Sequence, residues 1–331
     1  MNMDAQPLVS VVTPVYNGEK YLPECIESIL AQTYRHWRYI IVNNCSTDRS
    51  LEIAQDYALK DSRIRIHNNS QFLGMLPNHN HALRQISADS KYCKVVHADD
   101  WLFPECLEKM VQVAEEHPSV GLVGAYGLEE LYVTWHGLPY PSTVVPGRDI
   151  CRQSLLEGLY VFGTPTCLLM RSDLVRSRKC FYNESNFHAD SEVCYEVLQN
   201  TDFGFVHQVL TFTRRHNAAA TTFAERFNTF LPGELTCLVK YGRVYLTSEE
   251  YEKCLKENLD GYYRFLAESL LSRREKEFWD YHRTELKKLN ISLSRTKLIV
   301  AFGAVLADLL LYPKETVSSI IAHFTRRSST A

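Results

Sequence analysis

Several common site signatures are absent from this 331-residue chain. No G-x-G-x-x-G follows its first apolar stretch and no G-x-x-x-x-G-K-[ST] occurs anywhere, which excludes the Rossmann dinucleotide fingerprint and the P-loop. If a nucleotide binds here, its diphosphate must be held by a metal rather than by a glycine-rich loop. No two of the ten cysteines have C-x-x-C spacing, which argues against a zinc ribbon or a thioredoxin-like redox site.

The chain also lacks a strong net charge. Its formal charge of −3 gives no sign of a nucleic-acid partner. The charge is uneven, because the residues from Arg273 onward include 11 Lys/Arg and 6 Asp/Glu. A basic tail on an acidic body favours an anionic surface as partner of the tail. Residues 1–7 do not have a signal-peptide pattern, and we therefore expect a reducing, cytoplasmic location.

Two adjacent carboxylates follow a short apolar run at 92–96. Asp99 and Asp100 would repel each other at the end of a strand unless a cation offsets the cost. Carboxylates are preferred ligands of Mg²⁺ and Mn²⁺, so the pair indicates a metal-diphosphate site. The alternative is that the two acids cap a helix that begins near Pro104.

Apolar periodicity predicts strands and helices in alternation. The expected strands cover 8–13, 39–42, 63–67, 92–96 and 120–125, and the expected helices 19–32, 48–59, 78–86 and 104–117. Such alternation predicts an α/β fold with a mostly parallel, Rossmann-like central sheet flanked by helices. The polar segments 14–17, 43–48 and 99–100 each follow a strand, so they should converge at one edge of the sheet. That convergence favours the metal site over the helix cap.

Four blocks occur in an order and at a spacing that resembles family 2 of the inverting glycosyltransferases, with the type A nucleotide-sugar fold. The blocks are S-V-V-T-P-V-Y-N at 10–17, I-L-A-Q-T at 29–33, V-N-N-C-S-T-D at 42–48 and H-A-D-D-W at 97–101. The resemblance is good over 9–125 and weaker to about 216. It implies a nucleotide-sugar donor, Mg²⁺ or Mn²⁺, and transfer of one sugar with inversion at the anomeric carbon.

The resemblance also implies donor-binding residues. Pro14, Tyr16 and the adjoining Asn17 match the positions beside the nucleobase. Asn43 and Asn44 fall where many members carry an acid that reads uracil. An amide offers both a donor and an acceptor, so the pair can still read a base, and a UDP-sugar is the expected donor. The alternative for these two asparagines is plain turn chemistry. The remaining implied donor contacts are Asn78, Asp99, Arg214 and His216.

The implied metal ligands are Asp99 and Asp100, with Asp100 preferred as the direct ligand. His97 stands where many relatives have a third acid, which removes one oxygen ligand. Arg214 and His216 match an R-x-H element that closes over the diphosphate, and the alternative for both is surface charge. Residues 163–166 fall where relatives line the acceptor cleft.

Inverting transfer needs one general base for the acceptor hydroxyl. Asp190 aligns with the family's catalytic aspartate, and Glu192 is the reserve candidate. The alternative for Asp190 is the N-cap of the apolar-periodic helix that starts there, with Glu192 in its first turn.

The chain should comprise a catalytic domain at 1–222 and a helical extension at 223–331. Residues 298–312 are apolar apart from Asp308, but 15 residues fall short of the ~20 that a membrane-spanning helix needs. A second amphipathic stretch covers 316–324. These segments suit either an interfacial anchor on the inner face of the plasma membrane or a hairpin that packs on the body or forms a homodimer.

The sequence thus predicts a non-processive, metal-dependent inverting glycosyltransferase that acts on a glycan or lipid-linked glycan, as in surface-polysaccharide assembly. One rival is a nucleotidyltransferase, which usually has a glycine- and lysine-rich loop that residues 14–18 do not provide. The other is a non-catalytic nucleotide-sugar-binding protein, in which Asp190 would lie away from the metal acids.

Overall fold

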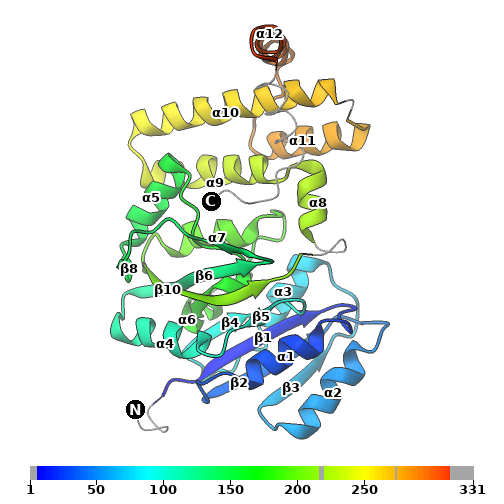
Figure 1. Ribbon diagram of the computed structural model, residues 1–331, viewed down its shortest axis with the longest axis vertical. Coiled ribbons are helices and arrows are strands. Elements are labelled where there is room, and N and C mark those ends of the chain that lie inside the picture. The colour runs from blue at the N-terminus through cyan, green and yellow to red at the C-terminus, as the bar shows by residue number, and fades with distance from the viewer. Residues whose placement is uncertain (1–5, 216–219, 273, 314–331) are drawn as a thin grey trace. The chain divides into compact units, whose positions relative to one another are not determined.

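A computed structural model describes residues 6–215, 220–272 and 274–313 (Figure 1). The chain divides into two compact units, the first ending at Arg215 and the second beginning with the next residue. The first unit contains the sheet and the segments that carry the metal and base predictions. The second is helical.

In the described part of the chain, ten strands form one sheet in the order β3-β2-β1-β4-β9-β6-β10-β5, with β7 paired to β6 and β8 to β10. The strands are β1 (Val9–Val15), β2 (Trp37–Asn43), β3 (Ile64–Asn68), β4 (Tyr92–Val95), β5 (Trp101–Leu102), β6 (Val120–Glu129), β7 (Tyr132–Thr134), β8 (Val144–Val145), β9 (Leu169–Arg171) and β10 (Asp202–Thr213). The four strands from β3 to β4 are parallel, as predicted. Beyond them the sheet is mixed, because β9 runs antiparallel to both β4 and β6.

Helices cover both faces of this sheet (Figure 1). They are α1 (Leu22–Leu30), α2 (Ser50–Lys60), α3 (Met75–Leu83), α4 (Cys106–Glu116), α5 (Gly147–Glu157), α6 (Ser172–Arg176) and α7 (Ala189–Val197), with a 3₁₀ turn, η2, at Pro165–Cys167. Helix α1 presents Leu22, Cys25, Ile26 and Ile29 on one buried stripe. This stripe joins α4 and the fully buried β1 in the main core. The predicted α/β class is confirmed.

Strand β10 is one continuous strand, and its register with β6 shifts near Val206 and Val209.

The helix-cap alternative for Asp99 and Asp100 is excluded. Strand β5 separates them from α4, and Glu105 occupies the N-cap position of that helix. The two acids therefore do not cap it.

The second unit consists of α8 (Ala220–Phe227), α9 (Phe230–Tyr245), α10 (Ser248–Leu271), α11 (Lys276–Lys288) and α12 (Arg295–Leu311). Thr247 and Glu250 form a capping box that fixes the start of α10. The core of this unit is largely aromatic and includes Tyr262, Phe265 and Phe278. The expected helical extension is confirmed.

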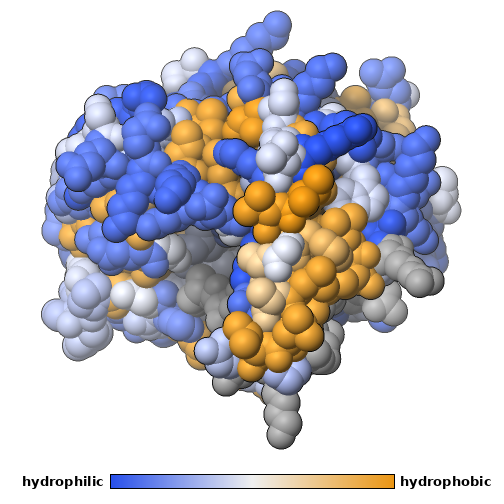
Figure 2. All heavy atoms as spheres, turned by 90° about the horizontal axis from the view of Figure 1, so that it is seen from above, coloured by the Kyte–Doolittle hydropathy of each residue, from blue (hydrophilic) through white to orange (hydrophobic). Residues whose placement is uncertain are grey.

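Helix α12 contacts α10 along one side and is apolar on its open side. Val305 is buried, whereas Ile299, Val300 and Leu310 are 71%, 68% and 85% exposed. Figure 2 looks onto this helix and shows apolar atoms gathered in a strip. Among the described residues, no helix has both the length and the hydropathy to cross a membrane. The predicted amphipathic stretch at 316–324 lies outside the described residues.

Candidate donor and metal site

The loops that follow β1 and β2 are tied together at one edge of the sheet. The Asn44 N–H donates to Val15 O at 2.8 Å, and the Thr47 N–H donates to Asn17 Oδ1 at 2.8 Å. Asn17 has a φ of 49°, in the left-handed region that asparagine tolerates better than most residues. Parallel strands end at a common edge, and β1 pairs with both β2 and β4, so these loops lie on the same edge as the acids after β4.

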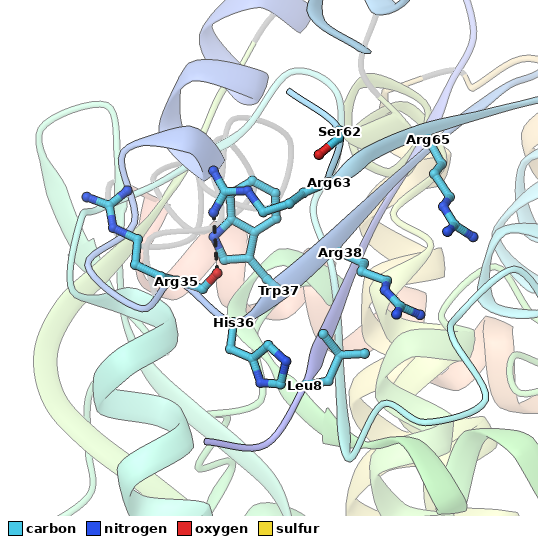
Figure 3. A pocket seen from close by; sticks show the side chains of 8 residues that line it. All are labelled: Leu8, Arg35, His36, Trp37, Arg38, Ser62, Arg63 and Arg65. Carbon is cyan, nitrogen blue, oxygen red and sulfur yellow. Dashed lines mark hydrogen bonds between the residues drawn. The ribbon is translucent and has the colours of Figure 1, made fainter. Parts of the chain in front are cut away.

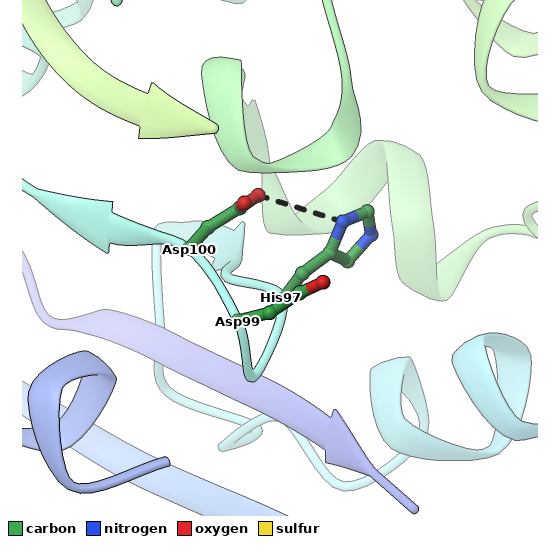
Figure 4. A group of neighbouring side chains, drawn as sticks. All are labelled: His97, Asp99 and Asp100. Atoms are coloured by element: carbon green, nitrogen blue, oxygen red, sulfur yellow. Dashed lines mark ion pairs between the residues drawn. The ribbon is translucent and has the colours of Figure 1, made fainter. Parts of the chain in front are cut away.

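The acids form a compact cluster with His97. One ligand atom from each of His97, Asp99 and Asp100 lies within 4.8 Å of the others, and Figure 4 shows the three side chains drawn together. His97 Nδ1 is 3.6 Å from Asp100 Oδ2. Asp100 is only 2% exposed. Burial raises the pKa of Asp100 to about 6, the neighbouring His97 opposes this rise, and the charge of Asp99 adds to it.

Asp100 is held by two donors from distant parts of the chain. The Thr166 hydroxyl donates to Oδ2 at 2.6 Å, and the backbone N–H of Arg214 donates to Oδ1 at 3.0 Å. The same hydroxyl accepts the His97 N–H at 3.1 Å. Thr166 sits in η2, which follows a turn at Gly163 with a φ of 69°. The carboxylate is therefore fixed in one orientation before any ligand arrives.

Arg214 reaches this cluster, and its role in binding the diphosphate stays a prediction. Its Nε donates to Asp99 O at 3.1 Å, and its guanidinium forms an ion pair with Glu24 of α1. The guanidinium also lies over the Tyr21 ring, 4.5 Å from its centroid. The cation is thus positioned beside the acids. His216, its predicted companion, lies outside the described residues.

An exposed aromatic pair lies beyond the end of β1. Tyr16 is 50% exposed and Phe72 is 58% exposed, and their ring centroids are 4.8 Å apart in an edge-on arrangement. Sequence reasoning selected Tyr16 but missed Phe72, which belongs to no motif. A lone aromatic in a polar loop after the third strand was the available signal. Such a pair offers a flat base a surface to stack on.

The predicted donor contacts Asn43, Asn44 and Asn78 are buried in an amide network. Asn44 donates to Leu73 O at 2.8 Å and accepts the Leu73 N–H at 2.9 Å. Asn78 Oδ1 accepts from Asn69 at 3.0 Å, and Asn43 donates to Asn68 at 2.6 Å. The bonds of Asn44 to Leu73 hold the loop that carries Phe72, which is compatible with the turn-chemistry alternative for Asn43 and Asn44. Their role in donor binding stays a prediction.

The two candidate bases occupy the first turn of α7 but differ in their surroundings. Glu192 is 5% exposed and accepts hydrogen bonds from the amides of Asn183 at 2.9 Å and Asn186 at 2.7 Å. Asp190 accepts the N–H of Ser191 at 2.9 Å and is less buried. Glu192 is consequently anchored as a structural acceptor, whereas Asp190 is the more accessible carboxylate.

A row of aromatic rings leads from Tyr182 to the acidic cluster. Burial, with the charge of Asp190 as the next cause, raises the pKa of Tyr160 and Tyr182 well above the usual tyrosine value. The Tyr160 hydroxyl lies 2.7 Å from that of Ser191, the neighbour of Asp190. The Tyr182 ring is 6.2 Å from that of His79, which is 5.2 Å from that of His97. Tyr160 also lines a cavity of about 370 Å³.

Comparison with known proteins adds a family to this geometry. The family model described as "Glycosyl transferase family 2" matches residues 10–178. The glycosyltransferase GlyG of Streptococcus pneumoniae is 34% identical over 195 residues, which cover 54% of this chain and 60% of GlyG. The chain spans about three fifths of the length of the curated relatives it matches first.

Solved structures share the fold at low sequence identity. The TarS fragment 1–349 of S. aureus, determined in complex with UDP-GlcNAc, has a TM-score of 0.62 at 18% identity, over 96% of this chain and 89% of that one. The mannosyltransferase PcManGT from Pyrobaculum calidifontis, determined with GDP-Man and Mn²⁺, has a TM-score of 0.56 at 14% identity, over 97% and 86%.

Proposed function

Because this chain belongs to glycosyl transferase family 2, we propose that it transfers one sugar from a nucleotide-diphosphate donor to a hydroxyl of a glycan acceptor, with inversion. The observation that carries the proposal is the fixed carboxylate of Asp100. It stands beside Asp99 and His97 and next to the Arg214 cation. Membership of this family leaves the nucleotidyltransferase rival without support.

The donor we propose is a UDP-sugar. The exposed rings of Tyr16 and Phe72 support stacking of the base, and Arg214 supports charge-assisted bonds to the diphosphate. TarS has been determined with UDP-GlcNAc and PcManGT with GDP-Man, so both bases belong in a binding test. Pro14 and Asn17 adjoin the base site in this proposal.

The residues present fit a divalent cation. One ligand atom from each of the two carboxylates and the imidazole lies within 4.8 Å of the others, and carboxylate oxygen and imidazole nitrogen are both common ligands of divalent ions. Asp99 and Asp100 would hold Mg²⁺ or Mn²⁺, with His97 as a third ligand. The bound ion supplies positive charge to the leaving diphosphate. A nitrogen ligand favours Mn²⁺ over Mg²⁺.

Asp190 acts as the general base in this proposal. It accepts the proton of the acceptor hydroxyl while that oxygen forms a bond to the anomeric carbon. The bond from the anomeric carbon to the diphosphate oxygen breaks, and its electron pair leaves with the nucleotide. Arg214 offsets the growing negative charge. The amide contacts of Glu192 support a structural role for that residue.

Binding of donor nucleotides by the whole chain tests this function. We expect UDP to bind the wild type in Mn²⁺ at least about tenfold more tightly than in EDTA, since an ion held by Asp99 and Asp100 would supply positive charge to the diphosphate. Calorimetric titration of UDP, GDP and their sugars gives the affinities. Slow release of sugar from one donor without acceptor would identify that donor. Equal binding with and without metal, for every donor, would reject the proposal.

The proposal extends to an inner-membrane surface. The exposed apolar side of α12 and its basic first turn, with Arg295 and Lys297, support insertion into an anionic cytoplasmic leaflet. A lipid-linked glycan is then the acceptor, as in surface-polysaccharide assembly, and the protein is cytoplasmic and peripheral. The alternative is that the same apolar side joins two copies as a homodimer.

A double substitution on α12 separates these alternatives. We expect Val300→Glu/Leu310→Glu to lower sedimentation with vesicles containing phosphatidylglycerol by at least about tenfold, because burial of each side chain contributes about 1.5–3 kcal/mol. Leu59→Glu, on the 87% exposed Leu59 of α2, is the matched control and should not change binding. Unchanged sedimentation, together with a fall in molecular mass from dimer to monomer, would contradict the membrane proposal.

A further inference from the structure

A second pocket lies at the opposite edge of the sheet from the acids. It is bounded by the residues at which the first three strands begin, whereas Asp99 and Asp100 follow the end of β4. Its volume is about 220 Å³. Figure 3 shows the lining side chains, which are Leu8, Arg35, His36, Trp37, Arg38, Ser62, Arg63 and Arg65. Four arginines and one histidine thus line one small hollow, with Arg35 and Arg65 on opposite sides of it in Figure 3.

Two of these arginines are held in place by carboxylates. Arg63 binds Asp61 through Nε at 3.1 Å and through a terminal nitrogen at 2.7 Å, and it stacks on Trp37 at 3.6 Å from the ring centroid. A second terminal nitrogen of Arg63 donates to Arg35 O at 3.3 Å. Arg38 pairs with Asp89 at 3.2 Å. These two charges are balanced, and their guanidinium planes are oriented.

The other two arginines have no carboxylate partner among the described residues. Arg35 donates to Leu30 O at 3.2 Å, and Arg65 is exposed on β3. The pocket therefore carries about two uncompensated positive charges, those of Arg35 and Arg65, beside the guanidinium groups of Arg63 and Arg38, which already bind Asp61 and Asp89. Guanidinium groups bind phosphate oxygens in pairs, and this geometry is more specific than that of an ammonium. The positive charge of this pocket therefore favours an anionic ligand.

We propose that this pocket binds a phosphate group. Its size limits the ligand, because 220 Å³ equals the liquid volume of roughly seven waters at about 30 Å³ each and lies below the range of ~300–1,000 Å³ typical of drug-sized ligands. A phosphate with its waters fits this volume. The phosphate comes either from a soluble phosphate or from a lipid head group. Neither source involves the donor site.

Substitution of the two uncompensated arginines tests the pocket without disturbing its folded frame. Inorganic phosphate is titrated calorimetrically, without divalent metal, into the wild type and Arg35→Gln/Arg65→Gln. We expect at least about tenfold weaker binding in the variant. The matched control is Arg226→Gln/Arg243→Gln, which removes the same charge from exposed pairs in the second unit and should stay within about twofold.

A vesicle arm identifies the source of the phosphate. Phosphatidylcholine vesicles with and without phosphatidic acid are sedimented with the same three proteins. Phosphatidic-acid binding that is lost only in the pocket variant supports a lipid phosphate, and binding of inorganic phosphate alone supports a soluble one. Equal phosphate affinity in wild type and pocket variant would overturn the proposal. If the pocket variant also lost UDP–Mn²⁺ binding, the proposal would be overturned, because the inorganic phosphate could then have bound at the donor site.

Discussion

Replacing Asp190 by asparagine is expected to lower the turnover number about 10²–10⁴-fold, the usual contribution of a positioned general base. The amide keeps the size of the side chain but cannot take a proton from the acceptor hydroxyl. Donor affinity should stay within about twofold, because Asp190 lies on the acceptor side of the proposed reaction. The measurement is the initial rate of sugar transfer at saturating donor, with UDP–Mn²⁺ affinity measured on the same preparation.

Glu192→Gln is the matched control, since it makes the same change two residues further along α7. A glutamine side chain has one acceptor oxygen where the carboxylate has two, so it can satisfy the Asn183 and Asn186 amides less well. A buried polar group left unpaired costs about 1–3 kcal/mol of folding free energy. We expect a lower melting temperature and nearly normal turnover of the folded enzyme. Lost turnover in Glu192→Gln together with normal turnover in Asp190→Asn would instead identify Glu192 as the base. Full turnover in both variants would exclude both carboxylates as the base, and the non-catalytic rival predicts no turnover by the wild type either.

Local patterns were enough to predict the first half of the sheet. Strand β1 and helix α1 each carry a complete apolar signal within one short segment, and parallel strands deliver their following loops to a common edge. The acids at 99–100 could therefore be placed beside the loop at 14–17 before any coordinates were known. The register shift of β10 could not be predicted in this way, because it depends on the pairing of β10 with β6 rather than on a local pattern.

The contacts that orient Asp100 could not be read from sequence. Thr166 is 66 residues away and Arg214 is 114 residues away, and Arg214 contributes a backbone N–H that any non-proline residue has. The antiparallel insertion of β9 between β4 and β6 brings η2 toward the acids. The basic pocket was missed for a similar reason. Its arginines come from two separate segments, around β2 and β3. A net charge summed over a long segment also includes nearby acids, so it does not reveal such a local cluster of arginines.

Asp100→Asn should abolish metal-dependent donor binding and lower transfer by about 100-fold or more, since loss of even an outer-shell partner costs metal sites 10–100-fold in affinity or activity. Asp100 is buried and fixed by two donors, so no neighbouring side chain can swing into its place. Calorimetric titration of UDP with and without Mn²⁺ gives the effect. Thr166→Val retains the carboxylate but removes one donor to it, and we expect a smaller loss.

His97→Asp tests whether the imidazole nitrogen in the same cluster is a metal ligand. The wild type is expected to prefer Mn²⁺ to Mg²⁺, because the imidazole nitrogen is a poorer ligand for the harder Mg²⁺. An aspartate in its place restores an all-oxygen set, so the ratio of Mn²⁺-supported to Mg²⁺-supported rates should fall severalfold. His79→Gln, which changes the ring in edge contact with His97, should leave that ratio unchanged. If both substitutions leave the ratio unaltered while Asp100→Asn still removes activity, the ion is held by the two carboxylates without the imidazole.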